Sequence, residues 1–351
     1  MLCVELFAGA GGAALGLERA GFRHGALVEW DVDACTTMRL AGLRPVVEGD
    51  VRDLETIEET VTQGFGYEPV TLLWSSFPCQ AWSVAGTRKG SADDRNGWPW
   101  TVDAIDYLKP KWFLAENVRG LTFHKRVNKK PCPGKKNPGT GDPTRCPGCY
   151  LDMVIIPQLK ERFAHAGYWI LDAADFGVPQ HRRRLIIWAG PEPLEAPQPT
   201  HGPTTDQPWV SMGEALNLGD FVWDSMRNTA ANPKQERPTP SAEPAPTVGG
   251  KGNQMISRPS PTVSCVEYKG SNDSYRDYSK EGVRPKMNKA SDALWLGTGR
   301  RRLTVEECAL LQDFPEDHVF CGTKKSRYQQ VGNAVPPKLA EVVGRIIAAK
   351  C

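Results

Sequence analysis

Short apolar runs alternate with amphipathic stretches through the amino-terminal third of the chain. The runs have the length of strands, and the stretches between them carry hydrophobic residues at helical spacing. The strand patterns fall at 2–7, 26–30, 45–47, 70–74 and 112–116, with helical patterns at 13–21, 32–41, 54–61 and 98–108. Strands that alternate with helices form parallel neighbours, because a helical crossover returns the chain to the same edge of the sheet. The sequence therefore predicts an α/β protein with a mainly parallel sheet.

Changes in composition divide the remainder of the chain. We predict a first domain over residues 1–190, with an insertion at about 124–150 that is rich in Pro, Gly and Lys. From 191 to 299 the composition shifts to Pro, Ser, Thr, Asn and Gly with little helical periodicity, which predicts a second, smaller domain. Helical spacing returns in 300–351, which we expect to rejoin the first domain.

Composition and charge narrow the class of protein. The chain has 351 residues, of which 40% are hydrophobic and 24% are charged, as in ordinary globular proteins. It contains no run approaching the ~20 apolar residues of a membrane span. Its amino terminus lacks the basic start of a signal or transit peptide, so we expect a cytoplasmic protein with no membrane role. The net charge of +2 decides little, but basic residues cluster at 124–136, 182–184 and 300–302.

A glycine-rich turn follows the first strand pattern. Gly9-Ala10-Gly11-Gly12 opens the first helix, where glycines let a ligand approach the backbone. With Ala14 the turn fits G-x-G-x-x-A, and Glu29 lies where a carboxylate can accept hydrogen bonds from ribose hydroxyls. These residues alone leave an NAD site, an S-adenosylmethionine site and a plain tight turn open. Asp50, at the end of the third strand pattern, could accept from an adenine amino group or could cap a helix.

A cysteine and a carboxyl group end two further strand patterns. Phe77-Pro78-Cys79-Gln80 follows one at the carboxyl edge, where doubly wound sheets bind ligands. Glu116 ends another, so Cys79 and Glu116 are expected to face one cleft. The small and polar residues of 83–97 are expected to form a lid over it.

An ordered set of motifs spans both ends of the chain and resembles the DNA (cytosine-5) methyltransferases of bacterial or phage type. The motifs are Phe7-x-Gly9-x-Gly11-Gly12, Pro78-Cys79-Gln80, Glu116-Asn117-Val118, Gln180-x-Arg182-x-Arg184, Arg302-Leu303-Thr304 through Leu311-Gln312-Asp313-Phe314-Pro315, and Gln330-Val331-Gly332-Asn333-Ala334-Val335-Pro336. The resemblance implies a Rossmann-like S-adenosylmethionine-dependent methyltransferase sheet with a smaller, mainly irregular or β target-recognition domain. It also removes the NAD alternative.

The resemblance further implies a reaction. The enzyme would transfer a methyl group to carbon 5 of a flipped-out cytosine in a specific double-stranded DNA sequence, through a covalent Cys79 adduct. Glu116 would contact ring N3, while Arg182 and Arg184 would hold the base carbonyl and Arg183 would point the opposite way. The alternatives are a transfer RNA cytosine-5 methyltransferase, whose Cys-Phe-Thr signature is not found, and a catalytically silent DNA-binding relative.

Cofactor and DNA contacts follow from the same resemblance. S-adenosylmethionine contacts are expected from Phe7, Gly9, Gly11, Gly12, Glu29, Trp30, Asp50, Val51, Pro78, Asn333 and Val335, although Trp30 could instead be core packing. DNA contacts are expected from Gln80, Ser83, Lys125 and Arg126. We expect a monomer, with a cognate restriction endonuclease as a separately acting partner.

The insertion carries the elements of a metal site. Cys146 and Cys149 form a C-x-x-C pattern, Cys132 lies earlier in the insertion, and turn residues accompany all three. His124 could complete a tetrahedral zinc site with these cysteines. The alternative is a flexible basic loop with free thiols. Solitary cysteines elsewhere, such as Cys35, Cys265 and Cys308, are expected to pack as small hydrophobic residues.

Overall fold

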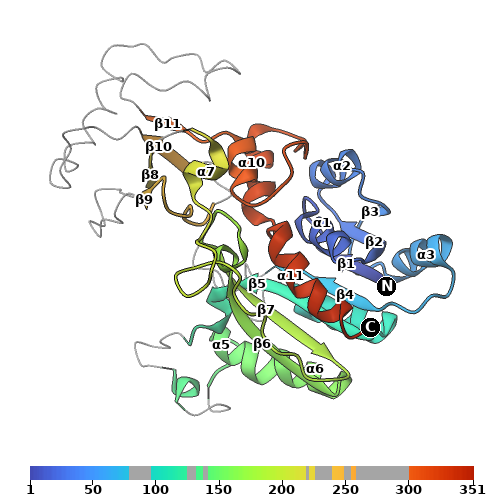
Figure 1. Cartoon of the computed structure of the whole chain (residues 1–351). Helices are drawn as coiled ribbons and strands as arrows, with labels where there is room; N and C mark the ends of the chain where they lie inside the picture. The colour runs from blue at the N-terminus through green and yellow to red at the C-terminus, as the bar shows by residue number, and fades with distance from the viewer. Residues whose placement is uncertain are drawn as a thin grey trace.

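Two sheets of unequal size organise the chain (Figure 1). The computed structural model describes residues 1–78, 96–124, 132–136, 141–218, 221–225, 239–248, 254–257 and 300–351. The larger sheet lies between layers of helices, and the smaller sheet stands at one end of the molecule. Among the described residues, no helix has the length and apolar character required to cross a bilayer.

The larger sheet has seven strands in the order β3-β2-β1-β4-β5-β7-β6. Their bounds are β1 Leu2–Leu6, β2 Arg23–Glu29, β3 Val46–Glu48, β4 Leu72–Ser75, β5 Trp112–Val118, β6 His165–Asp172 and β7 Arg183–Gly190. The first five strands are parallel, and β7 runs antiparallel to both β5 and β6. The predicted α/β fold is confirmed. Strand order reverses between β1 and β4, which is where such sheets bind ligands at their carboxyl edge.

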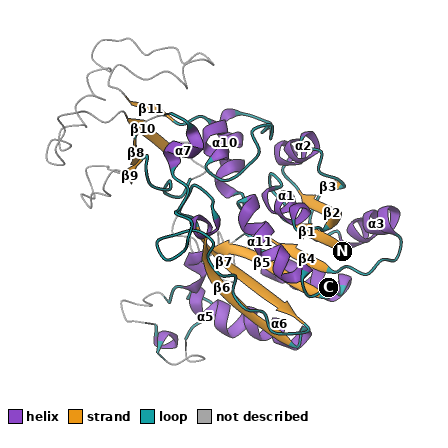
Figure 2. Ribbon diagram, viewed as in Figure 1, coloured by secondary structure: helices purple, strands orange, loops and turns teal. Residues whose placement is uncertain are grey.

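Helices bury both faces of this sheet, as the continuous apolar character of its strands requires. One face packs against α3 (Leu54–Phe65), α4 (Trp98–Leu108) and α6 (Ile156–Arg162). The other face packs against α1 (Gly12–Arg19), α2 (Val32–Leu40) and α11 (Pro337–Ala348). A Cβ at Gly16 of α1 would lie 2.1 Å from the Pro337 carbonyl oxygen, so α1 and α11 approach closely (Figure 2).

The smaller sheet is antiparallel, with the order β11-β10-β8-β9. Its strands are β8 Val222–Ser225, β9 Thr239–Pro240, β10 Gln254–Ser257 and β11 Arg300–Arg302. Its apolar cluster joins residues of α7 (Met212–Leu216) to residues of α9 (Val305–Leu310) and α10 (Lys324–Asn333). Part of the predicted returning segment thus packs with the smaller sheet, and the division into domains stays a prediction.

The segment between β5 and β6 contains several short helices. A 3₁₀ turn, η2 (Arg119–Thr122), follows β5 directly, and another, η3 (Pro133–Lys135), lies in the predicted insertion. The chain then forms α5 (Pro147–Tyr150) and a π-helical turn, η4 (Leu151–Ile155), which continues into α6. One more 3₁₀ turn, η5 (Ala173–Phe176), follows β6.

Candidate active site

A buried ion pair lies at the carboxyl edge of the larger sheet. Glu116, near the end of β5, forms an ion pair with Arg184 on the neighbouring strand β7, with Oε1 of Glu116 2.6 Å from Nε of Arg184. The two side chains are 9% and 11% exposed, respectively. The antiparallel pairing that places Arg184 opposite Val118 brings the two groups together. The guanidinium of Arg184 also donates from Nη1 to the Arg183 carbonyl oxygen at 3.0 Å, so the backbone of β7 helps to position the partner of Glu116.

The next residue of β5 fixes the turn that leads to Cys79. Asn117 donates from Nδ2 to the Phe77 carbonyl oxygen at 3.0 Å, and its Oδ1 accepts from the Val118 N–H at 2.9 Å. The Phe77 ring packs on Trp98 with centroids 5.4 Å apart. The chain entering Cys79 is therefore tied to the strand that carries Glu116.

Five predicted site residues lie outside the described residues: Cys79, Gln80, Ser83, Lys125 and Arg126.

Arg182 is fully buried and bonds to the protein's own backbone. Its guanidinium donates to the carbonyl oxygens of Gly332, Ala334 and Val248 at 2.9, 2.7 and 3.3 Å. Burial, followed by repulsion from Arg184, holds the pKa of Arg182 well below its usual value. The sequence analysis predicted that Arg182 and Arg184 together hold the base carbonyl and orient the catalytic pair of Cys79 and Glu116. In the structure Arg184 pairs with Glu116, while Arg182 fastens distant chain segments together.

Arg183, between these two, has a different environment. Its side chain is 60% exposed, and Nε lies 3.2 Å from Oδ2 of Asp172 on β6.

Glu29 presents a fixed carboxylate at the end of β2. It accepts backbone hydrogen bonds from Gly9, Trp30 and Asp31 at 2.8, 2.9 and 2.9 Å. Burial raises the pKa of Glu29, although the three N–H groups act in the opposite direction. Two carboxylate oxygens have lone pairs for about four hydrogen bonds, so one acceptor position remains for a hydroxyl group. Trp30 is 79% exposed, so the core-packing alternative for Trp30 is wrong.

The three glycines of the first turn meet different surroundings. Gly9 has a φ of 55°, and no atom lies within 4 Å of the place where its Cβ would be. A Cβ at Gly11 would lie 2.4 Å from Cδ1 of Leu43, and one at Gly12 would lie 2.2 Å from the Val335 carbonyl oxygen. Open space for a ligand therefore exists at Gly9, whereas Gly11 and Gly12 allow close packing of the protein.

Asp50 follows β3, which β2 separates from β1 and its glycine turn in the sheet. Its carboxylate accepts from Nε and from the backbone N–H of Arg52, both at 2.9 Å, and the Arg52 side chain holds the pKa of Asp50 below its usual value. The helix-cap alternative for Asp50 is wrong, because the Asp53 side chain caps α3 through the Thr56 N–H.

The remaining predicted cofactor residues differ in exposure. Phe7 and Pro78 are half-buried, Asn333 is exposed, and Val51 and Val335 are buried.

Comparison with known proteins decides the family. The sequence profile of the C-5 cytosine-specific DNA methylases matches residues 1–131 and 152–349. The chain belongs to this family. This methylase is a DNA cytosine-5 methyltransferase that uses S-adenosylmethionine, and the open space at Gly9, the carboxylate of Glu29 and the exposed Trp30 ring fit an adenosine-bearing cofactor.

Bacterial relatives match the methylase along nearly its whole length. It is 32% identical to the Type II methyltransferase M.NgoMIV of Neisseria gonorrhoeae, over 98% of this chain and 96% of that protein. It is 30% identical to M.NaeI of Lentzea aerocolonigenes, over 99% of this chain and 74% of that protein. The Dnmt2 methyltransferase of S. pombe shares the fold, with a TM-score of 0.61 at 14% identity over 99% and 98% of the two chains.

The predicted metal residues of the methylase come together in space. The ligand atoms of His124, Cys132, Cys146 and Cys149 lie within 4.8 Å of one another. Residues 132–151 are the part of this region that the family profile leaves unmatched. Cys35 and Cys308 are buried as expected, and Cys265 lies outside the described residues.

Sequence reasoning gave no role to several buried amides of the methylase. Gln180 donates to the Leu311 carbonyl oxygen at 3.1 Å and accepts from the Val248 N–H at 3.0 Å. Gln312 donates to the Val331 carbonyl oxygen. Like Asn117, both lie within the motifs that carry the family resemblance, and a polar amide in such an apolar setting was the signal that could have revealed them.

Proposed function

We propose that this methylase modifies cytosine within one specific double-stranded DNA sequence and that Cys79 is its nucleophile. The observation that carries the proposal is the buried Glu116–Arg184 pair. Glu116 lies on β5, the strand that Asn117 ties to the Phe77 carbonyl, two residues before Cys79. This arrangement would hold a carboxyl group, a guanidinium and a thiol at one edge of the sheet. A thiolate and an acid fixed on either side of a ring are what addition to cytosine requires.

In the proposed reaction the Cys79 thiolate adds to carbon 6 of cytosine, and the ring becomes nucleophilic at carbon 5. Glu116 donates a hydrogen bond or a proton at N3 as negative charge develops there, and Arg184 keeps its carboxyl group in position. Bound S-adenosylmethionine supplies the methyl group from its sulfonium centre. Loss of the carbon 5 proton to a base, expulsion of the thiolate and return of any N3 proton to Glu116 then regenerate both side chains and release 5-methylcytosine.

The target base must leave the stacked duplex to reach this edge. We infer that residues 191–299 supply base-specific contacts and that the 124–150 insertion contacts phosphates. Lys135 and Lys136 are exposed on the described part of that insertion, which supports the second inference.

The test of the mechanism is trapping of a covalent complex. In duplex DNA with 5-fluorocytosine, fluorine replaces the proton that must leave carbon 5, so the Cys79 adduct should persist through denaturing electrophoresis when S-adenosylmethionine is present. Cys79→Ser should abolish the adduct. Cys351→Ser, which changes an exposed thiol, should leave it intact. An adduct that survives Cys79→Ser would overturn the assignment of the nucleophile.

Substrate and partners can be tested in the same system. Type II relatives at 30–32% identity favour DNA over transfer RNA, and they favour a paired restriction endonuclease that acts separately. We propose a monomer that works in the cytoplasm, where its DNA substrate lies. Faster methylation of transfer RNA than of plasmid DNA would reverse the choice of substrate.

A further inference from the structure

Four potential metal ligands converge from three separate segments of the methylase. His124 follows η2, Cys132 precedes η3, and Cys146 and Cys149 lie at the start and within α5. The three cysteines are 3%, 0% and 1% exposed, respectively. Their convergence is a tertiary feature, because 22 residues separate His124 from Cys146.

The distances among these atoms are close to those of a metal site, with the two His124 distances in agreement and the Cys132–Cys149 distance shorter. Sγ of Cys132 and Sγ of Cys149 are 3.3 Å apart, far longer than the ~2.05 Å of a disulfide. The Nδ1 of His124 lies 3.6 Å from Sγ of Cys149 and 3.9 Å from Sγ of Cys146. A tetrahedral zinc ion with bonds of about 2.3 Å to sulfur and about 2.1 Å to nitrogen separates sulfurs by about 3.8 Å and sulfur from nitrogen by about 3.6 Å.

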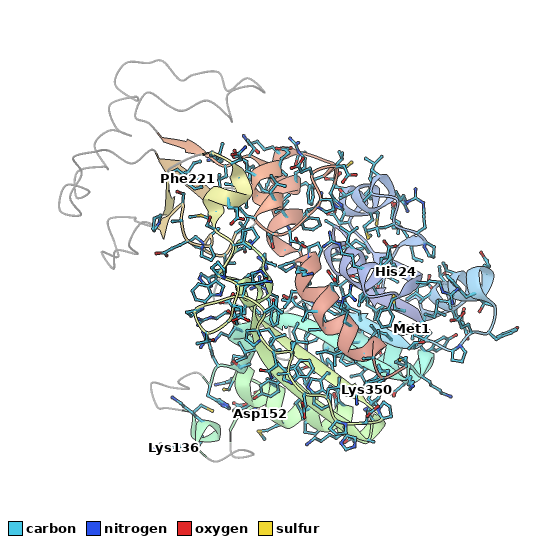
Figure 3. The ribbon with its side chains drawn as sticks, in the orientation of Figure 1. Met1, His24, Lys136, Asp152, Phe221 and Lys350 are labelled. Carbon is cyan, nitrogen blue, oxygen red and sulfur yellow. The ribbon has the colours of Figure 1, made fainter. Side chains whose placement is uncertain are left out.

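The histidine is oriented as a metal-binding histidine is. Its Nδ1 faces the sulfurs, while its Nε2 lies 3.4 Å from Oδ2 of Asp152 in η4. A carboxylate at one ring nitrogen keeps the proton there and leaves the lone pair of the other nitrogen free to bind a metal. Figure 3 labels Asp152 beside the larger sheet and its helices, and Lys136 on the outlying turn η3.

Glycines form the walls around the cluster. A Cβ at Gly141 would lie 2.0 Å from Sγ of Cys149, and one at Gly134 would lie 2.7 Å from the same atom. A Cβ at Gly148 would come within 2.9 Å of the His124 ring. Backbone without side chains therefore encloses the four ligand atoms on several sides, as in the tight turns that wrap a metal ion.

Simple apolar packing explains less of this arrangement. Buried thiols do pack as small hydrophobic groups, and Met153 contacts the three cysteines. Apolar packing does not require a histidine with one nitrogen directed at three sulfurs and the other at a carboxylate. One histidine and three cysteines with their ligand atoms gathered in this way are the donors of a metal site.

We propose that His124, Cys132, Cys146 and Cys149 bind one structural zinc ion that fastens the insertion to the catalytic domain. Four protein ligands close the coordination shell, so the ion has no open position for substrate. Two hydrogen bonds would connect the metal site to the catalytic domain. The Gly148 N–H donates to the Phe123 carbonyl oxygen at 3.2 Å, and Tyr150, next to Cys149, accepts from Nδ2 of Asn96 at 2.8 Å. The family profile omits residues 132–151, so the three cysteine ligands lie outside its match and His124 lies within it.

The first experiment measures metal in the full-length protein. Elemental analysis of chain purified without chelator should find about one zinc per chain, since the proposal contains a single site. Cys132→Ser and His124→Asn should each lose most of this zinc, and the matched control Cys351→Ser should keep it. Zinc that remains in both ligand variants would overturn the proposal.

Cobalt provides a readout that does not depend on the variants folding. Wild-type protein exchanged into Co²⁺ should show the visible bands of a tetrahedral thiolate complex, and stripping the metal should lower the melting temperature. A wild-type protein that binds neither zinc nor cobalt, or that contains a Cys132–Cys149 disulfide by mass spectrometry, would refute the site. These readouts are independent of methyl transfer, so failure of the Cys79 mechanism would leave them unaffected.

Discussion

Replacing Asn117 with alanine should slow methyl transfer far more than it weakens binding of S-adenosylmethionine. The side chain is 3% exposed, and its amide holds the Phe77 carbonyl at 3.0 Å, two residues before the proposed nucleophile. Without the amide, that buried carbonyl loses the hydrogen bond that Asn117 gives it. The turn can recover a partner only by moving, and movement displaces Cys79.

The expected loss of rate follows from the free-energy cost of leaving a buried carbonyl without a hydrogen bond. An unsatisfied buried acceptor costs about 1–3 kcal/mol. If this energy is what keeps the turn in its reactive position, the rate falls by the same amount, at about 1.4 kcal/mol for each factor of ten. The expected loss in the rate of methyl transfer is therefore roughly 5-fold to 150-fold.

The assay is single-turnover transfer of a labelled methyl group to DNA, with thermal denaturation measured in parallel. Tyr328→Phe is the matched control, because the Tyr328 hydroxyl also donates to a buried backbone carbonyl, that of Leu303, but in the apolar cluster of the smaller sheet. Both variants should lose similar stability, and only Asn117→Ala should lose rate. Equal rates in the two variants would show that the tether has no part in positioning Cys79.

Three further predictions follow from buried groups. Gly9→Ala should mainly weaken S-adenosylmethionine binding, with a backbone cost of roughly 1–2 kcal/mol because the φ of Gly9 is positive. Gly12→Ala should mainly lower the melting temperature, because its methyl group would lie 2.2 Å from a carbonyl oxygen. Calorimetric titration measures the first effect, and melting curves measure the second. Arg182→Lys should cost about 2–5 kcal/mol of unfolding free energy by stranding buried carbonyls, and the exposed Arg183→Lys should cost little. Burial lowers the pKa of His24 to about 4. The contribution of neutral His24 to stability is therefore complete above its unfolded pKa of about 6.5 and is lost as the pH falls towards 4. His24→Gln should make the melting temperature less dependent on pH over that window, and the same pH dependence in variant and wild type would contradict the reasoning.

Local periodicity made the main features of the fold predictable. The helical pattern at 98–108 matches α4, and the strand pattern at 112–116 lies within β5, because each element buries one face or both along its own length. The pairing of β11 with β10 was not predictable, since short strands with little alternation carry no information about their neighbours.

Site residues were harder to predict where their partners are distant in sequence. The hydrogen bonds of Arg182 span 66, 150 and 152 residues, so no local pattern could reveal that its guanidinium faces the backbone. The glycine motif likewise did not distinguish Gly9, which faces open space, from Gly12, which faces Val335. The metal residues were easier because C-x-x-C with turn residues signals a zinc site by residue type and local spacing, although the four ligands converge only in the tertiary structure.

The close contact of α1 with α11 has a consequence for synthesis of the enzyme. A ribosome releases α1 long before α11, so Leu17 and its apolar neighbours on the sheet lack their cover until α11 has been synthesised. The Val335 carbonyl also reaches Gly12 only at that stage. A chain that lacks α11 should therefore be a substrate for chaperones and unable to mark DNA, which confines modification of the genome to molecules that include α11.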